Sequence, residues 1–394
     1  MQRSFFGMAV VLGLISAIGP FAIDMYLPAL PTIGKALAAS PAAVQASLIV
    51  FFIALGIGQV VYGPLSDMHG RKPPLYAGSV LFIVGSIGCA LAPDVEALVA
   101  WRFLQGLGAS GGMVIARAVI RDLHTGTEAA RLMSLLMLVF SVSPILAPLA
   151  GSLLIELSGW RAVFWAVTVA GVLSLLLLAA RLPETRPAHE RRDSSWAGAL
   201  ADYRQLLRDP HFLGLALIGG FGIASFFAYL ANSSFVLIDH YGLSSRQYGL
   251  AFAANAAAFI GASQLTARLG SRFGLAPLAR AAAGVFAATM ALLFVLQLSG
   301  MDSLALMLVL LFVGYGFLGL VVPTSMVLAM EAYGAMAGTA SALAGTLHFV
   351  AGIAVMALVS PYANGAPLPM LAGIAGSAAL TFVLAWRTLR AAKG

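Results

Sequence analysis

Charged side chains are scarce in this chain of 394 residues: Asp, Glu, Lys and Arg make up 9%, against about 25% in an ordinary soluble domain. Hydrophobic residues make up 61%, so a soluble fold would expose far too much apolar surface. Cysteine occurs once, at Cys89, which excludes an intramolecular disulfide. The sequence also lacks a His/Cys cluster with metal-ligand spacing and a phosphate-binding glycine loop with lysine. We therefore expect a membrane protein that is not an enzyme and holds no metal or cofactor.

Long apolar runs fill most of the chain. Runs of roughly 18–25 residues have the length of a membrane-spanning helix and predict about twelve spans, near 5–28, 44–66, 74–92, 97–120, 130–156, 160–181, 211–234, 246–267, 277–298, 303–328, 335–359 and 367–388. Placing both termini on one side puts 18 of the 22 Lys and Arg on that side. The positive-inside rule then predicts cytoplasmic termini. The net charge of +7 reflects this asymmetry and does not indicate nucleic-acid binding.

One long polar segment, residues 182–210, divides the spans into two sets of six. It is basic and contains proline, and its Trp196–Leu207 part predicts a short amphipathic helix on the inner membrane surface. Equal halves joined by a cytoplasmic linker are typical of a duplicated transporter. We therefore expect an all-α membrane protein of two pseudo-symmetric six-helix bundles, residues 1–181 and 211–394.

One acid lies well inside a predicted span. Asp24 stands in the first span, where a carboxylate costs roughly 2.5–3.5 kcal/mol to insert. Arg102 in the fourth span comes to a similar depth, roughly 6–10 Å below the outer surface. The two charges can stabilise each other directly or through Gln105 and water, while burial favours the neutral acid. We expect Asp24 and Arg102 to carry proton coupling; the alternative is a static ion pair that only fixes helix packing.

The connection between the second and third spans reads Gly63-Pro-Leu-Ser-Asp-Met-His-Gly-Arg-Lys72. Gly63 and Gly70 permit close helix contact and a tight reversal, while Asp67 can accept from helix amides or a basic side chain. Asp122, at the inner end of the fourth span, offers Arg71 an acidic partner. This signature resembles that of the major facilitator superfamily, which implies that Asp67, Arg71 and Asp122 latch the two halves during gating.

The fifth span carries two prolines in Ser141-Val-Ser-Pro-Ile-Leu-Ala-Pro-Leu-Ala-Gly151. Each removes a backbone hydrogen bond, so the pair predicts a kink. The pattern resembles the superfamily's exporter motif, although Ser141 and Ala147 stand where glycine is often seen. The resemblance implies that Pro144, Pro148 and Gly151 seal the interface between the halves against proton leak.

The likeness to one branch of the superfamily extends over nearly the whole chain. It rests most specifically on Asp24-Met-Tyr-Leu-Pro-Ala-Leu-Pro31, with Tyr62-Gly-Pro-Leu-Ser-Asp67, Ile120-Arg-Asp122 and Gly338-Thr-Ala-Ser-Ala-Leu-Ala-Gly-Thr346 beside it. These strings resemble the bicyclomycin- and chloramphenicol-resistance (Bcr/CflA) drug–proton antiporters. The resemblance implies a multidrug efflux antiporter of the bacterial inner membrane that exchanges external protons for hydrophobic antibiotics. Asp24 would titrate and the proton gradient would supply the energy; we expect a monomer in the lipid bilayer.

Aromatic, amide and methionine side chains within the spans predict the substrate cavity: Tyr26, Gln105, Met113, Phe226, Tyr229, Asn232, Asn255 and Phe259. Aromatic rings suit flat drugs by stacking, and a few polar groups orient them. Packing against neighbouring helices or lipid is the alternative for each phenylalanine, whereas a lipid-facing amide is costly.

Two other functions stay open. A proton-coupled importer or exporter of a small metabolite would use the same fold, although the prolines of the fifth span argue mildly against import. A membrane sensor that transports nothing would tolerate neutral substitutions at both Asp24 and Arg102.

Overall fold

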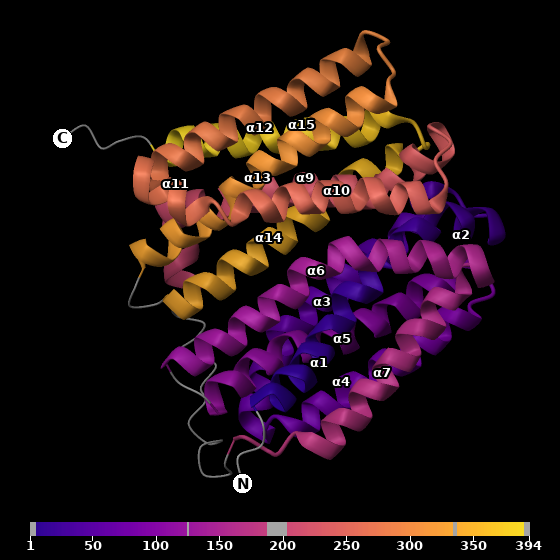
Figure 1. Ribbon diagram of the computed structural model, residues 1–394, viewed down its shortest axis with the longest axis vertical. Coiled ribbons are helices and arrows are strands. Elements are labelled where there is room, and N and C mark those ends of the chain that lie inside the picture. The colour runs from indigo at the N-terminus through magenta and orange to yellow at the C-terminus, as the bar shows by residue number, and fades with distance from the viewer. Residues whose placement is uncertain (1–4, 124–125, 187–202, 334–336, 390–394) are drawn as a thin grey trace. The chain divides into compact units, whose positions relative to one another are not determined.

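The computed structural model describes residues 5–123, 126–186, 203–333 and 337–389, and the regular elements in these ranges are all helical (Figure 1). Eleven helices are long and apolar enough to cross a membrane. Ser245–Ser263 and Thr266–Phe273, which meet at 42°, give a twelfth span if they are counted together. Helices suit this role because they satisfy their backbone polar groups internally. The expected all-α class of about twelve spans is therefore confirmed.

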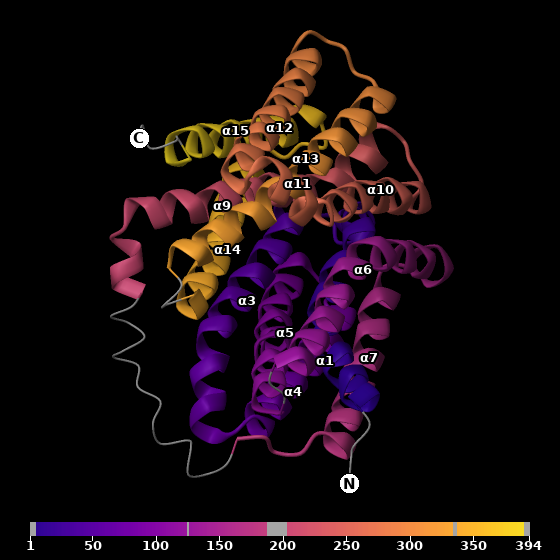
Figure 2. The same cartoon turned by 60° about the vertical axis from the view of Figure 1, so that its left-hand side comes forward.

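The chain divides into two compact units, and the first is Met1–Ser195. Its helix α5 packs against α1, α3 and α4, and Figure 2 shows α5 running beside α1 and α3. α5 is among the most buried spans, so it is the core helix of this unit. The elements of the unit are α1 (Phe5–Asp24), η1 (Leu27–Ala29), α2 (Leu30–Ala36), α3 (Pro41–His69), α4 (Lys72–Leu91), α5 (Val95–Leu123), α6 (Gly126–Ser158) and α7 (Arg161–Arg181).

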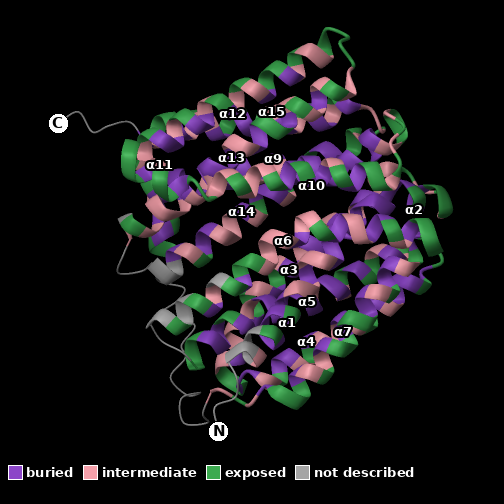
Figure 3. Cartoon of the chain, in the orientation of Figure 1, coloured by how far each residue is buried: buried purple, intermediate pink, exposed green. Residues whose placement is uncertain are grey.

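The second unit is Trp196–Gly394, and α9 has the central place in it. This helix packs against α13, α14 and α15 and is largely buried, whereas α12 exposes many residues (Figure 3). The elements are α9 (Pro210–Ser234), the π-helical η3 (Phe235–His240), α10 (Ser245–Ser263), α11 (Thr266–Phe273), α12 (Leu275–Leu298), α13 (Leu304–Ala332), α14 (Ala337–Val359), η5 (Ser360–Tyr362) and α15 (Pro367–Thr388).

The expected linker, residues 182–210, falls between α7, which ends at Arg181, and α9, which begins at Pro210. Residues 203–207 are helical. The rest of the surface helix expected over residues 196–207 lies outside the described ranges, so that expectation stays a prediction.

Polar side chains mark where several helices begin. The residue before each of four helices accepts a hydrogen bond from a backbone N–H of the first turn: Ser40 before α3, Asp209 before α9, Ser244 before α10 and Ser303 before α13. Ser244 and Gln247 form a reciprocal capping box. These caps supply acceptors to N–H groups that have no partner within the helix, which fixes the starting point of each element.

Glycines allow α5 to approach two of its neighbours closely. A side chain at Gly108 would overlap the backbone of Phe82 in α4, and its Cβ would lie 2.5 Å from the carbonyl oxygen of Gly78. A Cβ at Gly112 would lie 2.5 Å from the carbonyl oxygen of Ile15 in α1. Lipid supplies no hydrophobic drive for helix association, so membrane helices depend on such close packing. Gly108 and Gly112 therefore tie the core helix of the first unit to two different neighbours.

Substituting Gly108→Ala should destabilise the protein by about 1–3 kcal/mol, because the new methyl group meets rigid backbone and not a movable side chain. The measurement is the midpoint temperature of unfolding in detergent. The matched control is Gly56→Ala in α3, where a Cβ meets no atom within 4 Å in the described structure. We expect the control to be neutral or slightly stabilising. Equal midpoints for the two variants would contradict the packing role.

Candidate functional site

The first membrane span is interrupted at its acid. α1 ends at Asp24, and after a turn the chain continues as η1 and the short helix α2. Pro28 and Pro31 lie at the start of these two elements, and neither has an N–H group to continue the preceding helix. The carbonyl end of α1 is therefore left inside the unit, where Asp24 is only 6% exposed.

Arg102 of α5 binds this carbonyl end. Its Nη1 donates to the carbonyl oxygen of Ala22 (3.2 Å) and to Oε1 of Gln105 (2.6 Å). The guanidinium carbon lies 4.4 Å from the ring centre of Tyr26 and 4.1 Å from that of Phe51. A helix C-terminus carries partial negative charge and aromatic faces attract cations, so both surroundings favour the buried charge. Among the described residues, Nε and Nη2 of Arg102 have no hydrogen-bond partner.

Asp24 is held by a different helix. Its Oδ2 accepts a hydrogen bond from Oγ of Ser143 in α6, at 3.0 Å. The direct ion pair considered from the sequence is not formed between the described side chains of Asp24 and Arg102: Nη1 of Arg102 donates to Ala22 and Gln105, and Oδ2 of Asp24 accepts from Ser143. The end of α1 is thus contacted by two helices: α5 binds its carbonyl group through Arg102, and α6 binds its Asp24 side chain through Ser143.

The three residues of the first unit that were predicted to line a substrate cavity are buried in that unit, Tyr26 and Gln105 beside Arg102 and Met113 against Gly19 of α1. The hydroxyls of Tyr26 and Ser47 share a hydrogen bond of 2.7 Å. Gln105 donates to Oγ of Ser86 at 2.8 Å. Met113 is 8% exposed. In the structure these side chains pack and hydrogen-bond within the unit, and their contact with a substrate stays a prediction.

Three of the five cavity residues predicted in the second unit lie together. Phe226 and Tyr229 of α9 contact each other and both contact Phe252 and Tyr315, so the four rings form one cluster. Asn255 of α10 donates to the hydroxyl of Tyr229 at 3.1 Å. Phe226 is half-buried, whereas Tyr229 is completely buried. Tyr229 and Asn255 are thus paired within the unit.

The other two predicted cavity residues lie elsewhere in the second unit. Nδ2 of Asn232 donates to the carbonyl oxygen of Ala228, one turn earlier in its own helix (2.9 Å). The backbone of Phe259 in α10 lies against Gly319 of α13, where a side chain would overlap it. The backbone of Phe259 therefore marks a close approach of two helices, and contact of its ring with a substrate stays a prediction.

Arg71, just after α3, joins acids of two helices. Its Nη1 donates to Oδ1 of Asp67 (2.6 Å), and its Nε and Nη2 donate to the two carboxylate oxygens of Asp122 (2.7 and 3.0 Å). The Arg71 side chain is 3% exposed. Burial lowers the pKa of Arg71, but the hydrogen bonds and charges of Asp122 and Asp67 outweigh burial and raise that pKa. The structure thus brings the three predicted gating residues together within the first unit.

Glu184, which follows α7, completes this cluster and was missed by sequence reasoning. Its carboxylate oxygens accept from the backbone N–H groups of Arg71 (2.8 Å) and Lys72 (3.1 Å), where α4 begins. Asp67 was a candidate for accepting helix amides, but the structure pairs Asp67 with the Arg71 side chain and gives the amides to Glu184. An acid suits this place because a helix N-terminus carries partial positive charge.

The next two residues extend the same contact. Oγ1 of Thr185 donates to Oδ2 of Asp122 (2.9 Å), and Nε of Arg186 donates to the carbonyl oxygen of Asp67 (3.0 Å). The sequence did contain a signal for this contact. An acid, a hydroxyl and a base follow one another at residues 184–186, directly after a span and on the same predicted side of the membrane as residues 70–72. Residues 184–186, called the clamp segment below, therefore fasten the end of the first unit to its gating cluster.

Each unit has a helix that ends at a glycine with positive φ. Gly70 ends α3 with φ of +90°, and Gly274 ends α11 with φ of +82°. This backbone region is readily adopted only by glycine, so both reversals depend on it. Gly63 differs from the expectation, because a Cβ there would meet no atom of the described residues within 4 Å. Close helix contact is therefore not the reason for glycine at position 63 in this structure.

Pro144 and Pro148 lie inside the continuous helix α6. Gly151, three residues beyond Pro148, faces the break in the first span: a Cβ there would lie 2.9 Å from the carbonyl carbon of Met25. The absence of a side chain at Gly151 thus permits α6 to contact the residue that follows Asp24. This contact lies within the first unit, and the sealing role inferred for these residues stays a prediction.

The run Gly108-Ala-Ser-Gly-Gly112 has the Gly-x-Ser-x-Gly spacing of a hydrolase nucleophile elbow, which requires a turn between strand and helix. Here the run lies inside α5. Oγ of Ser110 donates to the carbonyl oxygen of Leu107 (2.7 Å). The serine is therefore part of helix packing and not a nucleophile.

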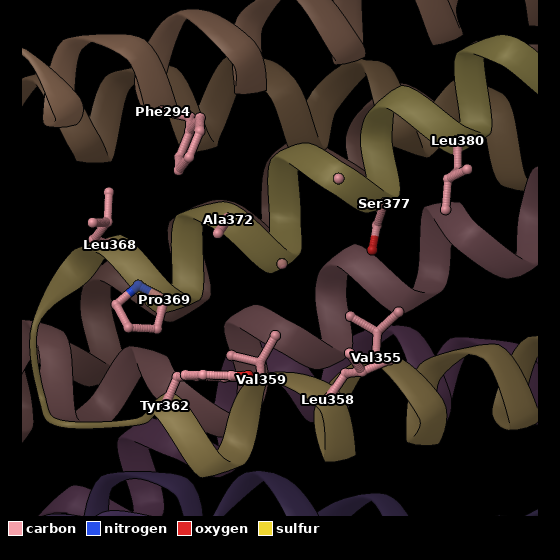
Figure 4. Close-up of a pocket in the computed structure, with 12 residues that line it drawn as sticks. Phe294, Val355, Leu358, Val359, Tyr362, Leu368, Pro369, Ala372, Ser377 and Leu380 are labelled. Atoms are coloured by element: carbon pink, nitrogen blue, oxygen red, sulfur yellow. The ribbon is translucent and has the colours of Figure 1, made fainter.

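The second unit also contains a cavity of about 530 Å³ between α12, α14, η5 and α15 (Figure 4). Leu358 and Tyr362 line one wall, and Leu368 and Leu380 line the other. The hydroxyl of Ser377 is buried there and has no hydrogen-bond partner among the described residues. None of the eight residues predicted to contact substrate borders this cavity.

Removing the Glu184 carboxylate should loosen the start of α4. Glu184→Ala leaves two backbone N–H groups without their acceptor, as in the loss of a helix cap, so we expect a destabilisation of about 0.5–2 kcal/mol. Hydrogen–deuterium exchange measures the effect at the amides of residues 70–72, where exchange should accelerate. The control is Glu156→Ala at the exposed end of α6. Unchanged exchange at residues 70–72 in Glu184→Ala would show that the clamp segment does not hold this connection.

The sequence matches the family model of the Major Facilitator Superfamily over residues 12–356. An "Uncharacterized MFS-type transporter YdgK" of Bacillus subtilis (strain 168) is 39% identical over 355 residues, covering 89% of this chain and 88% of the relative. A "Bicyclomycin resistance protein homolog" of Haemophilus influenzae is 30% identical over 375 residues, covering 94% and 93%. A "Chloramphenicol resistance protein" of Pseudomonas aeruginosa is 30% identical over 283 residues, covering 71% and 66%.

Solved structures agree with the fold. The crystal structure of a D-xylose-proton symporter has a TM-score of 0.74 at 18% identity, covering 98% of this chain and 97% of the other. A bacterial homolog of the human lysosomal transporter Spinster has a TM-score of 0.76 at 16% identity, covering 99% and 98%. At these identities the likeness concerns the fold alone. Together with the family match and the sequence relatives, it shows that the chain is a multi-pass membrane transporter, that it belongs to the major facilitator superfamily, and that it falls in the Bcr/CflA branch of drug transporters.

Proposed function

We propose that this transporter exports hydrophobic antibiotics in exchange for protons, with Asp24 as the proton-binding group. The names of two relatives, which refer to bicyclomycin and chloramphenicol resistance, support this class of substrate. The proton gradient supplies the energy, and no cofactor is needed. The protein works as a monomer in the bacterial inner membrane with both termini in the cytoplasm, in accord with the distribution of Lys and Arg.

The position of Asp24 is the observation that supports this function most strongly. Among the Asp and Glu residues that the structure describes, Asp24 is the one that lies far from both ends of a membrane span, here Val10–Ala36. Asp67, Asp122 and Glu331, by contrast, lie within the last turn of their spans. A buried carboxylate is costly in a membrane, and such residues typically mark an ion or proton pathway.

The surroundings of Asp24 allow either protonation state. The hydrogen bond from the hydroxyl of Ser143 favours the carboxylate. Burial and the partial negative charge at the end of α1 favour the neutral acid. Because these effects oppose each other, a movement of α6 that alters the Ser143 contact changes the balance between the two protonation states of Asp24.

The proposed cycle uses this balance. Asp24 takes a proton from the external side, and the protonated carrier opens to the cytoplasm. Drug binding then favours release of the proton, and the drug-loaded form reopens to the outside. The cluster of Asp67, Arg71 and Asp122 stabilises one of the two forms through charged hydrogen bonds, which are stronger than neutral ones.

Replacing Asp24→Asn should abolish proton-coupled export, because the amide cannot bind or release a proton at any relevant pH. The measurement is drug-driven proton movement in liposomes, together with drug resistance in a host that lacks its own pumps. The panel includes chloramphenicol-type, sulfonamide and bicyclomycin compounds. We expect at least a tenfold loss of coupled transport with near-normal folding.

The matched control is Glu96→Gln, which removes an exposed acid at the start of α5 and should leave transport unchanged. Drug accumulation in cells with and without a proton uncoupler shows the direction of transport. Cells that contain an exporter accumulate less drug than cells without it, and the difference disappears when the uncoupler is added. Full drug-stimulated proton movement in Asp24→Asn would refute the proposed role of Asp24.

A further inference from the structure

Ser143 differs from several other buried hydroxyls of the first unit. Ser86 and Thr168 each donate to the carbonyl oxygen four residues earlier in their own helix, and Ser152 of α6 donates to that of Pro148 in the same way. Such back-bonding is the usual behaviour of hydroxyls within a helix. Ser143 instead donates across to Asp24, 119 residues away in the sequence. Its hydroxyl is therefore used for a contact between helices.

Ser143 also stands at a weakened place in α6. Pro144 follows it directly, and Pro148 comes one turn later. Neither proline has an N–H group, so the carbonyl groups of residues 140 and 144 lack their usual helical donors. Kinks in helices occur at such places. Ser143 therefore lies next to the part of α6 that has lost backbone hydrogen bonds and bends most easily.

A second contact attaches α6 to the same break in the first span. Gly151 lies against the backbone of Met25, and it is eight residues beyond Ser143, or about 12 Å along the helix. The two contacts lie on either side of Pro148. The stretch of α6 that contains this proline is thus fixed at one end by packing and at the other by the hydrogen bond to Asp24.

The charged side chains of the neighbouring helices do not contact the Asp24 carboxyl in place of the Ser143 hydroxyl. α5 supplies Arg102, which is engaged by the carbonyl group of Ala22 and by Gln105. It also supplies Arg117, whose guanidinium carbon lies 5.9 Å from the ring centre of Phe140 in α6 and not on the Asp24 carboxyl. The charged residues of α6 are ten or more residues from Ser143: Glu128, Arg131 and Glu156. Those of α7 are its first and last residues, Arg161 and Arg181. In the described structure, Ser143 is therefore the polar group that contacts the Asp24 carboxyl directly.

We propose that Ser143 is a positioning residue that couples the protonation of Asp24 to the proline-containing part of α6. The proposal rests on the proton-binding role of Asp24. An ionised carboxylate accepts the Ser143 hydrogen bond as a charge-assisted contact, which is roughly twice as strong as a neutral one. When Asp24 takes up a proton, one carboxyl oxygen becomes a donor and the contact weakens. The proline-containing part of α6 then loses one of its two contacts with the break in the first span, the other being the packing of Gly151, and bends more readily.

The test compares Ser143→Ala with Ser143→Thr, which keeps a hydroxyl. In liposomes, the pH at which drug-driven proton movement is half-maximal should move up by about half to one pH unit in Ser143→Ala, because the ionised carboxyl loses its donor. Ser143→Thr should restore the wild-type midpoint. A lower unfolding temperature in Ser143→Ala with an unchanged pH midpoint would mean a purely structural role and would overturn the proposal.

Hydrogen–deuterium exchange of residues 138–150 gives an independent readout. In the wild type and in Ser143→Thr, exchange there should change with pH beyond the change seen in α9, which serves as the internal reference. In Ser143→Ala and in Asp24→Asn this additional pH dependence should disappear. If Asp24→Asn abolishes coupling but Ser143→Ala keeps both the midpoint and the exchange pattern, the coupling through α6 is wrong and the proton role of Asp24 stands. If Asp24→Asn retains coupling, the proposed function itself fails.

Discussion

The contact between the Arg102 guanidinium and the carbonyl end of α1 is the interaction on which the first unit depends. It lets helix α1 end inside the unit, because the carbonyl of Ala22 in its last turn receives a charged donor. It also gives the buried cation a partner that is not a carboxylate, so Asp24 remains available to another helix. If Arg102 formed a closed ion pair with Asp24, the acid would have little reason to change its protonation.

The core helix α5 connects this region to the gating cluster. Arg102 and Asp122 are 20 positions apart in a helix that runs without interruption from Val95 to Leu123. At 1.5 Å per residue the separation is about 30 Å, close to the thickness of the hydrocarbon core. A rigid element of this length transmits a shift at one end to the other, and the clamp segment adds the end of α7 to the same cluster. The arrangement places the proposed proton site and the predicted gating residues on one continuous helix.

The sequence predicted the features that depend on composition and on short spacing. Apolar runs predicted the spans, and the motif around residues 63–72 predicted that Asp67 and Arg71 lie together. Asp122 was joined to them from its place at the inner end of the fourth span and from the resemblance to the superfamily. Features that depend on which distant side chains meet were beyond its reach. The Ser143 contact and the cap formed by Glu184 each join residues more than 100 positions apart, and no periodicity reports such pairs. The same limit explains why a direct Asp24–Arg102 pair was considered from their equal depth, since depth does not fix the partner.

The central claim is that the Asp24 carboxyl changes its protonation when substrate binds. Infrared difference spectroscopy of the purified protein in lipid tests this claim directly, because a protonated carboxyl has a C=O stretching band that a carboxylate lacks. The account predicts a band that is absent from Asp24→Asn and that disappears when a chloramphenicol-type substrate is added. A band that survives in Asp24→Asn, or a carboxyl that stays ionised at every pH with and without substrate, would contradict it.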